Sequence, residues 1–290
     1  MLTVIPDLHA DPARLSASFA QAGPEIAFLG DFIDGGTGAD DAAVLREVRG
    51  RIDAGRAIGV MGNHELNAIL FHRRGADGQP LRERSQKNIA QHRSFLSAFG
   101  TETPEALDWT EWFLRTLPLW HERPGLRLVH AFWSDPLIAT IRARRPDGFL
   151  QHGDLPEIAA ESTEFSRAVK LLVSGPEVRL PGSHGFADIK GNLRRDVRVA
   201  WWRAGARSWK ELALSVPDPS ALPAGDPGAN LADILYPGDG PCVLFGHYKM
   251  APPLRIDHDR AACLDYPAAP CLYRWDGEDR LGPEQLLALL

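Results

Sequence analysis

The chain has 290 residues, which suits one large domain with elaborations. Its 38 acidic and 32 basic side chains give a net charge of −6 with neutral histidines, which argues against nucleic-acid or anionic-membrane binding driven by overall charge. Hydrophobic residues at 44% and charged residues at 24% exclude a disordered chain.

Strand-like and helix-like segments alternate through the first 65 residues. Short apolar runs predict buried strands at residues 2–5, 26–29 and 57–61. Helices are predicted after Asp11-Pro12, an N-cap followed by proline, and over residues 40–54, where apolar residues recur on one face. This alternation predicts an α/β fold with a largely parallel sheet, in which functional residues gather beyond the carboxyl ends of the strands.

The pattern becomes helical over residues 73–118, which we interpret as a helical insertion. Ile89, Phe95, Leu96 and Phe99 predict one amphipathic helix, and a second is predicted over residues 107–117. A further helix is predicted over residues 157–173. Later apolar runs predict strands at residues 126–129, 197–201 and 243–245.

Cysteine usage and hydropathy bear on the compartment. The three cysteines, Cys242, Cys263 and Cys271, form no C-x-x-C pair, which argues against a disulfide framework or a thiolate zinc site. No apolar run approaches 18 residues, so no membrane helix is expected. Because Asp7 comes too early for a signal peptide, we expect a cytoplasmic protein.

Metal-binding side chains follow several of the predicted strands. They stand in Asp7-Leu8-His9, Gly30-Asp31-Phe32-Ile33-Asp34, Gly62-Asn63-His64-Glu65, His130 and Gly246-His247. Each motif alone is equally typical of a surface turn, a capped helix start or a packed histidine. Their common place at strand ends favours a metal site instead. Carboxylate and amide oxygens mixed with imidazoles suit Mn, Fe or Zn better than Ca.

In this order the motifs resemble those of calcineurin-like metallophosphoesterases, in particular the bacterial branch of the phosphoprotein phosphatases, which is related to the diadenosine tetraphosphate hydrolases. The resemblance extends from Asp7 to about Trp275. It implies a two-sheet α/β metallophosphoesterase sandwich with the metals at the sheet edge. We therefore expect a single domain over residues 1–290, with the helical insertion at 73–118 inside it.

The resemblance also implies two divalent metal ions and a role for each motif. Asp7 and His9 would hold the first ion, Asp31 would bridge both, and Asn63, His130 and His247 would complete the second. A metal-bridging hydroxide would attack phosphorus, while His64, oriented by Asp34, would protonate the leaving oxygen. From the ligand types we expect manganese, with iron or zinc as alternatives.

The chain departs from the family pattern at the residue that binds phosphate. Gly35 stands where the phosphoprotein phosphatases have an arginine that binds the phosphate group. Either another cation takes this role, or activity is weaker and substrate choice differs. We select Arg198 and Arg74 as substrate-binding candidates, although solvated surface positions are the alternative for both. Restoring the arginine, Gly35→Arg, is expected to raise affinity for phosphomonoesters. The remaining histidines are interpreted as surface or structural residues: His72, His92, His121, His152, His184 and His258.

The expected function is the hydrolysis of phosphomonoesters, on a phosphoprotein or a small molecule, as in Ser/Thr phosphatases. One alternative is a dinucleoside polyphosphate hydrolase or nucleotidase, which would need an aromatic or hydrogen-bonding site for the base. Another is a catalytically weakened protein that binds phosphate as a sensor. No membrane partner is expected. The sequence leaves the physiological substrate, the metal and the oligomeric state open.

Overall fold

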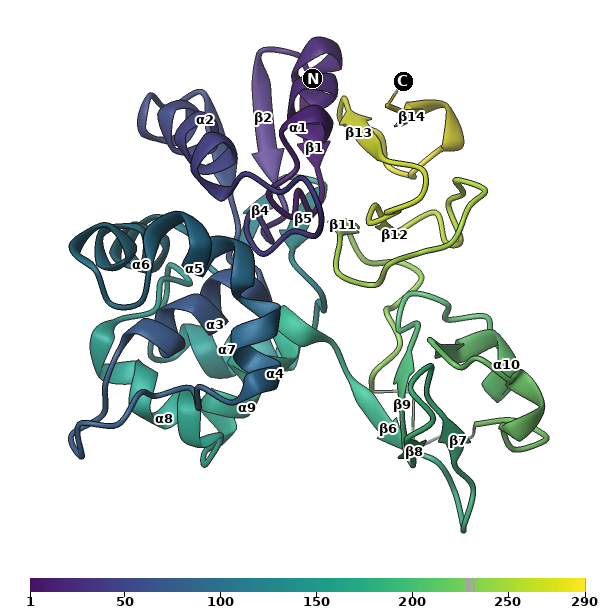
Figure 1. The fold of residues 1–290 in the computed structure, drawn as a ribbon. Coiled ribbons are helices and arrows are strands. Elements are labelled where there is room, and N and C mark those ends of the chain that lie inside the picture. The colour runs from purple at the N-terminus through teal and green to yellow at the C-terminus, as the bar shows by residue number, and fades with distance from the viewer. Residues whose placement is uncertain (228–230, 232, 290) are drawn as a thin grey trace.

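The computed structural model describes residues 1–227, 231 and 233–289, and two β-sheets form its centre (Figure 1). The first sheet has the strand order β14-β13-β1-β2-β3. Its strands are β1 (Leu2–Ile5), β2 (Glu25–Phe28), β3 (Ala57–Gly59), β13 (Cys271–Trp275) and β14 (Leu286–Ala288). The three N-terminal strands are parallel, as predicted, and the antiparallel edge comes from the C-terminal end of the described chain.

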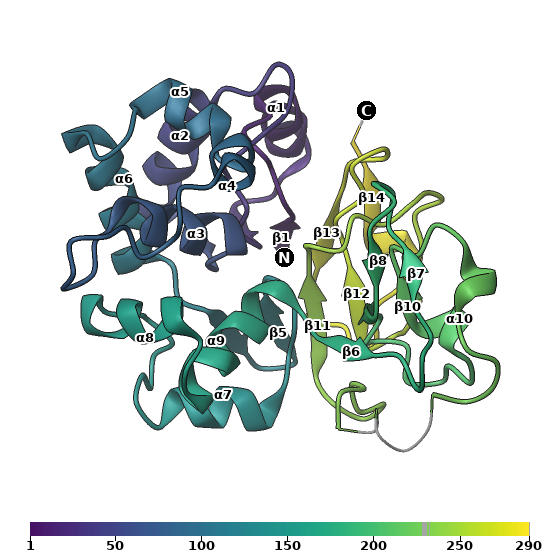
Figure 2. The same ribbon diagram turned by 60° about the horizontal axis from the view of Figure 1, so that its bottom comes forward.

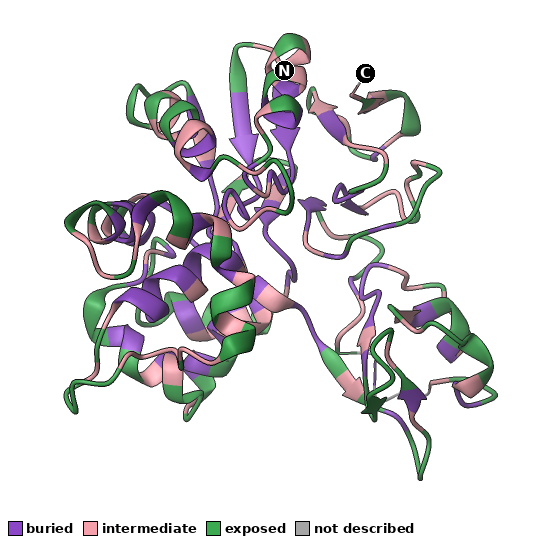
Figure 3. Ribbon diagram, viewed as in Figure 1, coloured by how far each residue is buried: buried purple, intermediate pink, exposed green. Residues whose placement is uncertain are grey.

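The second sheet has the strand order β12-β11-β5-β4. Its strands are β4 (Trp120–Arg123), β5 (Leu126–Val129), β11 (Cys242–Phe245) and β12 (Ala261–Cys263). Because β5 and β11 are parallel, their carboxyl ends meet at one edge. Side chains of both sheets, among them Val4, Phe28, Leu128 and Leu244, join one hydrophobic core, which gives the expected two-sheet α/β sandwich. Figure 3 shows buried positions along the strands of both sheets.

Helices α1 (Pro12–Gln21) and α2 (Asp41–Asp53) connect the first three strands. Asp11 caps α1, since its Oδ1 accepts the backbone N–H groups of Ala13 and Arg14 at 2.9 and 3.0 Å. The other large helices gather on one side of the sheets (Figures 1 and 2). They are α3 (Asn63–His72), α4 (Gln86–Gln91), α5 (Arg93–Phe99), α6 (Pro104–Thr116), α7 (Asp135–Arg142), α8 (Leu155–Ala160) and α9 (Glu164–Ser174).

Two single helices predicted from apolar spacing are each broken in two. The helix expected through Ile89 and Phe99 is α4 and α5, which meet at His92. The helix expected over 157–173 is α8 and α9, because Glu161 takes a left-handed φ of 48° and the side chain of Thr163 caps α9. A one-residue break leaves the apolar period almost intact, so periodicity alone does not detect it.

A small β lobe, residues 177–222, lies beside the second sheet (Figure 2). It contains β6 (Glu177–Arg179), β7 (Phe186–Ala187), β8 (Leu193–Arg194), β9 (Asp196–Val199), α10 (Trp209–Leu212) and β10 (Ala213–Leu214). Its buried residues, including Val197 and Trp209, form a second hydrophobic cluster. Trp201 links it to the sandwich, where its indole N–H donates to the carbonyl oxygen of Ala131 at 2.9 Å. Among the helices described, none has the length and apolar character needed to cross a membrane.

Candidate metal centre

The predicted metal ligands converge at the carboxyl ends of strands from both sheets. They are Asp7 and His9 after β1, Asp31 after β2, Asn63 at the start of α3, His130 after β5 and His247 after β11. In the described part of the chain, two groups place ligand atoms within 4.8 Å of one another: His9, Asp31 and His64, and Asp31, His130 and His247. Because Asp31 belongs to both, the groups adjoin and share a carboxylate.

Glu65 fixes the loop that carries Asp31. Its fully buried carboxylate accepts the backbone N–H groups of Asp31 and Phe32 at 2.8 Å each and of Gly62 at 3.0 Å. Burial, reinforced by the charge of Asp31, raises the pKa of Glu65 to about 7. A Cβ at Gly62 would lie 2.3 Å from Asp31 Oδ1, so only glycine permits this approach. The sequence pattern suggested only a helix cap for Glu65.

Two imidazoles have nitrogens that suit a cation. His9 Nε2 and His247 Nε2 are buried and have no hydrogen-bond partner among the described residues. Burial lowers the pKa of both side chains, so both are neutral and offer a lone pair. Each belongs to a different group, and unpartnered buried polar atoms are rare in proteins without a ligand. The donor set therefore fits two divalent cations held by nitrogen and oxygen.

His130 shows the electrostatic character of the shared position. Its Nδ1 lies 2.6 Å from Leu29 O, which leaves Nε2 directed at Asp31 Oδ1, 3.4 Å away, and Asn63 Oδ1, 3.1 Å away. Burial alone would lower the pKa of His130, but the Asp31 carboxylate raises it to about 10. The negative potential that produces this shift is one that a cation would neutralise.

Asp7 belongs to neither of the two groups. Its carboxylate accepts the backbone N–H of His247, with N–O distances of 3.1 and 3.2 Å, and thereby connects the two sheets. A Cβ at Gly246 would lie 1.9 Å from Asp7 Oδ2, so glycine is required there as well. Burial raises the pKa of Asp7. Its role as a ligand, like that of the other predicted ligands, stays a prediction.

His64 and Asp34 form the expected pair. His64 Nδ1 lies 2.8 Å from Asp34 Oδ2, and its Nε2 lies 3.8 Å from Asp31 Oδ2, so the ring connects Asp34 to the cation groups. Burial would lower the pKa of His64, but Asp31 and Asp34 raise it to about 9. Of the two interpretations given for His92, surface or structural, the structure excludes the surface one. His92 is 1% exposed, and its Nδ1 lies 2.7 Å from Asp34 Oδ1.

The two arginines selected from the sequence lie in different places. Arg198, on β9, has its guanidinium 5.8 Å from the Tyr248 ring centroid, and its charge helps to lower the pKa of His247 after burial. Arg74 instead follows the far end of α3, about 15 Å along the axis from Asn63. It binds Glu102 at 2.8 Å, so the structure does not bring it to the site.

One cation near the site was missed. Lys249 is exposed, and its charge contributes to the lowered pKa of His9, which burial dominates. Lys249 stands two residues after His247, and this proximity was the only indication in the sequence that it lies near the site.

Gly35 has no room for a side chain. A Cβ there would lie 2.1 Å from His9 O and 2.6 Å from the Cβ of Ala39. An arginine would therefore displace the loop that carries His9. This geometry contradicts the expectation that Gly35→Arg raises phosphate affinity.

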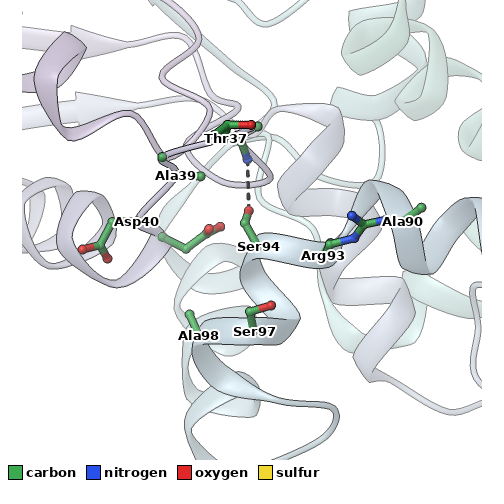
Figure 4. A pocket seen from close by; sticks show the side chains of 12 residues that line it. Thr37, Ala39, Asp40, Ala90, Arg93, Ser94, Ser97 and Ala98 are labelled. Atoms are coloured by element: carbon green, nitrogen blue, oxygen red, sulfur yellow. Dashed lines mark hydrogen bonds between the residues drawn. The ribbon is translucent and has the colours of Figure 1, made fainter.

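A cavity of about 920 Å³ begins at Gly35, next to Asp34, and runs between the 35–41 loop and helices α4 and α5 (Figure 4). Ser94 closes one side, where its Oγ accepts the backbone N–H of Gly35 at 3.1 Å. Arg93, Ser97 and Ala98 continue the wall along α5. The lining residues are small, polar or charged, and no aromatic ring is among those described.

Known structures give weak similarity to this chain. A metallophosphoesterase from Sphaerobacter thermophilus is 24% identical with a TM-score of 0.31, and the match covers 45% of this chain and 46% of that one, less than half of its length. A cold-active protein-tyrosine phosphatase of a psychrophilic Shewanella is 14% identical, with a TM-score of 0.46 and 94% and 74% coverage. A protein serine/threonine phosphatase from Saccharomyces cerevisiae is 13% identical, with a TM-score of 0.42 and 99% and 78% coverage. No curated protein matches the chain.

The family assignment comes from a match to a family model. The model of the calcineurin-like phosphoesterases matches residues 1–180, which is more than half of the chain. This segment contains all the predicted ligands except His247, together with the His64–Asp34 pair. The chain therefore belongs to the calcineurin-like phosphoesterase family.

Proposed function

We propose that the protein is a dinuclear metal-dependent phosphatase that hydrolyses phosphomonoesters in the manner of Ser/Thr phosphatases. The observation that carries this proposal is the position of Asp31, whose carboxylate lies within 4.8 Å of ligand atoms of His9 on one side and of His130 and His247 on the other. The Nε2 of His64, 3.8 Å from Asp31 Oδ2, is left as the proton donor. A carboxylate shared by two cations beside a proton donor suits in-line displacement at phosphorus by a two-metal site. The proposed ligands are Asp7, His9, Asp31, Asn63, His130 and His247.

Each catalytic side chain has one task in this proposal. When bound, two divalent cations would neutralise phosphoryl oxygens and make a water molecule acidic enough to act as nucleophile. The protonated Nε2 of His64 gives its proton to the leaving oxygen as the P–O bond breaks. Asp34 accepts the Nδ1–H of His64, holds the ring and stabilises its positive charge. Arg198 and Lys249 bind the phosphate in place of the arginine that Gly35 excludes.

Manganese is the proposed metal, because nitrogen and oxygen ligands without thiolate suit it; iron and zinc are the alternatives. Metal analysis of protein purified without added metal, followed by reconstitution with each ion, would identify the ion that supports turnover. Retention of a single ion at full activity would contradict the dinuclear arrangement.

The cavity beside Asp34 favours an extended phosphorylated chain over a nucleotide. Its wall offers hydroxyl groups, backbone groups of a glycine-rich loop and the exposed Arg93. A nucleobase is usually bound by stacking on an aromatic ring, and the described lining has none. We therefore place a phosphopeptide ahead of a dinucleoside polyphosphate.

The test is the manganese-dependent hydrolysis of a phosphopeptide, p-nitrophenyl phosphate, its bis-ester and diadenosine tetraphosphate, with metal content measured on the same sample. We expect two metals and turnover of both monoesters. His64→Asn should keep both metals and lose about 100-fold in kcat on the phosphopeptide, with a smaller loss on p-nitrophenyl phosphate, whose leaving group needs less acid assistance. Turnover of diadenosine tetraphosphate alone would replace the phosphatase proposal. Two metals without any turnover would favour a phosphate-binding protein.

A further inference from the structure

Five buried or half-buried residues, joined by four contacts, form a continuous hydrogen-bonded line that ends at the proposed acid. The backbone N of Glu102 lies 3.0 Å from His72 Nδ1, and His72 Nε2 lies 3.1 Å from His92 Nε2. His92 Nδ1 then lies 2.7 Å from Asp34 Oδ1, and the other oxygen, Oδ2, lies 2.8 Å from His64 Nδ1. The line crosses from α3, through the junction of α4 and α5, to the loop after β2.

The first contact assigns the protons along the whole line. A backbone N–H can only donate, so His72 Nδ1 accepts and its ring proton is on Nε2. That proton is donated to His92 Nε2, so the ring proton of His92 is on Nδ1 and is donated to Asp34. A second proton on His92 would face the proton of His72, so His92 is neutral. Burial lowers the pKa of His72 to about 4, in agreement with a neutral ring there.

Packing prevents both rings from turning. His72 and His92 are 2% and 1% exposed. The ring of His92 stacks on Phe95, with centroids 4.7 Å apart and an interplanar angle of 16°. The carboxylate of Glu102, whose N–H begins the line, is held by Arg74 and Arg84.

The junction of α4 and α5, which contributes His92, also anchors the backbone beside Asp34. Ser94, at the beginning of α5, accepts the N–H of Gly35, and Asp41 Oδ1 accepts the N–H of Asp34 at 3.0 Å. His92 and Ser94, at the start of α5, thus hold the loop after β2 through the carboxylate of Asp34 and the backbone of Gly35. Asp41, at the start of α2, holds the backbone of Asp34.

We propose that His92, with its tautomer fixed by His72, is a positioning residue that directs Asp34 toward the general acid His64. Because His92 occupies Oδ1, the Nδ1–H of His64 takes Oδ2, and the ring presents Nε2 to the leaving oxygen. The second donor also stabilises the buried carboxylate, which is 3% exposed at the side chain, in its charged form. The inference rests on the proposed function, in which His64 protonates the leaving group.

Two substitutions of His92 separate positioning from packing. An asparagine amide reaches the place of Nδ1 and keeps the donor to Asp34, whereas a glutamine amide reaches the place of Nε2 and keeps the partner of His72. Each leaves one buried partner unpaired, so their costs in stability should be similar. His152→Gln is the control, since this histidine is 57% exposed and binds Glu111 at the surface.

The measurement compares kcat and KM on phenyl phosphate, which has a poor leaving group, with those on p-nitrophenyl phosphate. We expect His92→Gln to lose roughly 10- to 100-fold in kcat on phenyl phosphate, several-fold less on p-nitrophenyl phosphate, with KM and bound metal unchanged. His92→Asn should stay within about threefold of the wild type on both substrates. Equal losses for both variants, or equal losses on both substrates, would overturn the inference.

Imidazole nitrogen NMR of the metal-free protein supplies a readout independent of turnover. The wild type should show Nδ1–H for His64 and His92 and Nε2–H for His72, and His92→Gln should shift the Nδ1–H signal of His64. A different tautomer of His72 or His92 would overturn the inference. His64→Asn is measured alongside. If it lacks the leaving-group dependence, or the wild type is inactive, the proposed function fails and takes this inference with it. If His64→Asn behaves as expected and His92→Gln does not, the inference fails alone.

Discussion

Gly35 determines where a phosphate-binding cation can stand. With His9 O only 2.1 Å from a Cβ at this position, no side chain can extend from it toward the cation groups. Under the proposed function, the positive charge comes from another segment, and the charges of Arg198 and Lys249 act on His247 and His9 respectively. Arg198 is attached to the small β lobe, and Lys249 follows the second sheet.

Arg198→Met should raise KM for p-nitrophenyl phosphate by about 10-fold and leave the bound metal unchanged, because a hydrogen bond to a charged phosphate contributes about 1.5–3 kcal/mol. Steady-state kinetics and metal analysis check this. Arg179→Met is the matched control, since Arg179 lies in the same small sheet and its side chain is 66% exposed. An unchanged KM in Arg198→Met, with a raised KM in Lys249→Met, would assign the role to Lys249 instead.

The packing of α3 against the α4–α5 segment makes stability depend on pH through His72. Burial lowers the pKa of His72 from 6.5 to about 4, the charge of Arg84 acts in the same direction, and Glu102 and Asp34 oppose the shift. The unfolded chain therefore binds a proton near pH 6.5 that the folded chain binds only near pH 4. Stability should fall as the pH decreases through this window, by up to about 3 kcal/mol from this residue.

Urea unfolding of the wild type and His72→Phe, from pH 7.5 to 4, measures this contribution. Phenylalanine keeps a ring of similar size but cannot bind a proton. The advantage of the wild type over His72→Phe in the free energy of unfolding should therefore shrink as the pH falls. Parallel stability curves would show that His72 does not carry the effect.

Helices and strands were predictable from the sequence where several local signals agreed. They were not predictable where a single residue breaks a helix. The segments up to α3 combine apolar periodicity with caps such as Asp11, and the structure confirms them. The breaks at His92 and Glu161 interrupt no apolar pattern. Strands of two residues, such as β7 and β8, are too short to show alternation, so the small β lobe was not anticipated.

The residues of the candidate site also fall into those that the sequence identified and those that it did not. Residues that follow an apolar strand directly, such as Asp31 and His247, were identified because the strand end itself was visible in the sequence. Glu65, His92 and Lys249 were not, because their contacts connect segments that are distant in the chain or come from a loop. Partners such as the backbone of Asp31 for Glu65 become apparent only after folding.

We propose that the chain is one metallophosphoesterase domain, with the helices of residues 73–118 and the small β lobe as elaborations. The lobe has its own hydrophobic cluster, whereas both sheets and the large helices share the main core. Such an arrangement allows a peripheral part to open without loss of the centre.

Trp209→Ala tests this independence. Trp209 is 4% exposed in the core of the lobe, and truncating a buried tryptophan costs about 3–5 kcal/mol. Amide hydrogen exchange should accelerate over residues 177–222, while β1 and β11 stay protected and the metals stay bound. KM should rise, because Arg198 lies on β9. Equal acceleration in both sheets would show that the lobe and the sandwich unfold as one unit.

The contact between Asp7 and the backbone of His247 joins groups 240 residues apart in the chain. A growing polypeptide can form β1, β2 and β3 early, but the second cation group stays incomplete until β11 has left the ribosome. In the proposed dinuclear arrangement, the second cation can therefore bind only late in the synthesis of this protein. Under the proposed function, a nascent chain arrested before β11 would bind a cation at the first group only, and it would lack phosphatase activity while most of its length was already made.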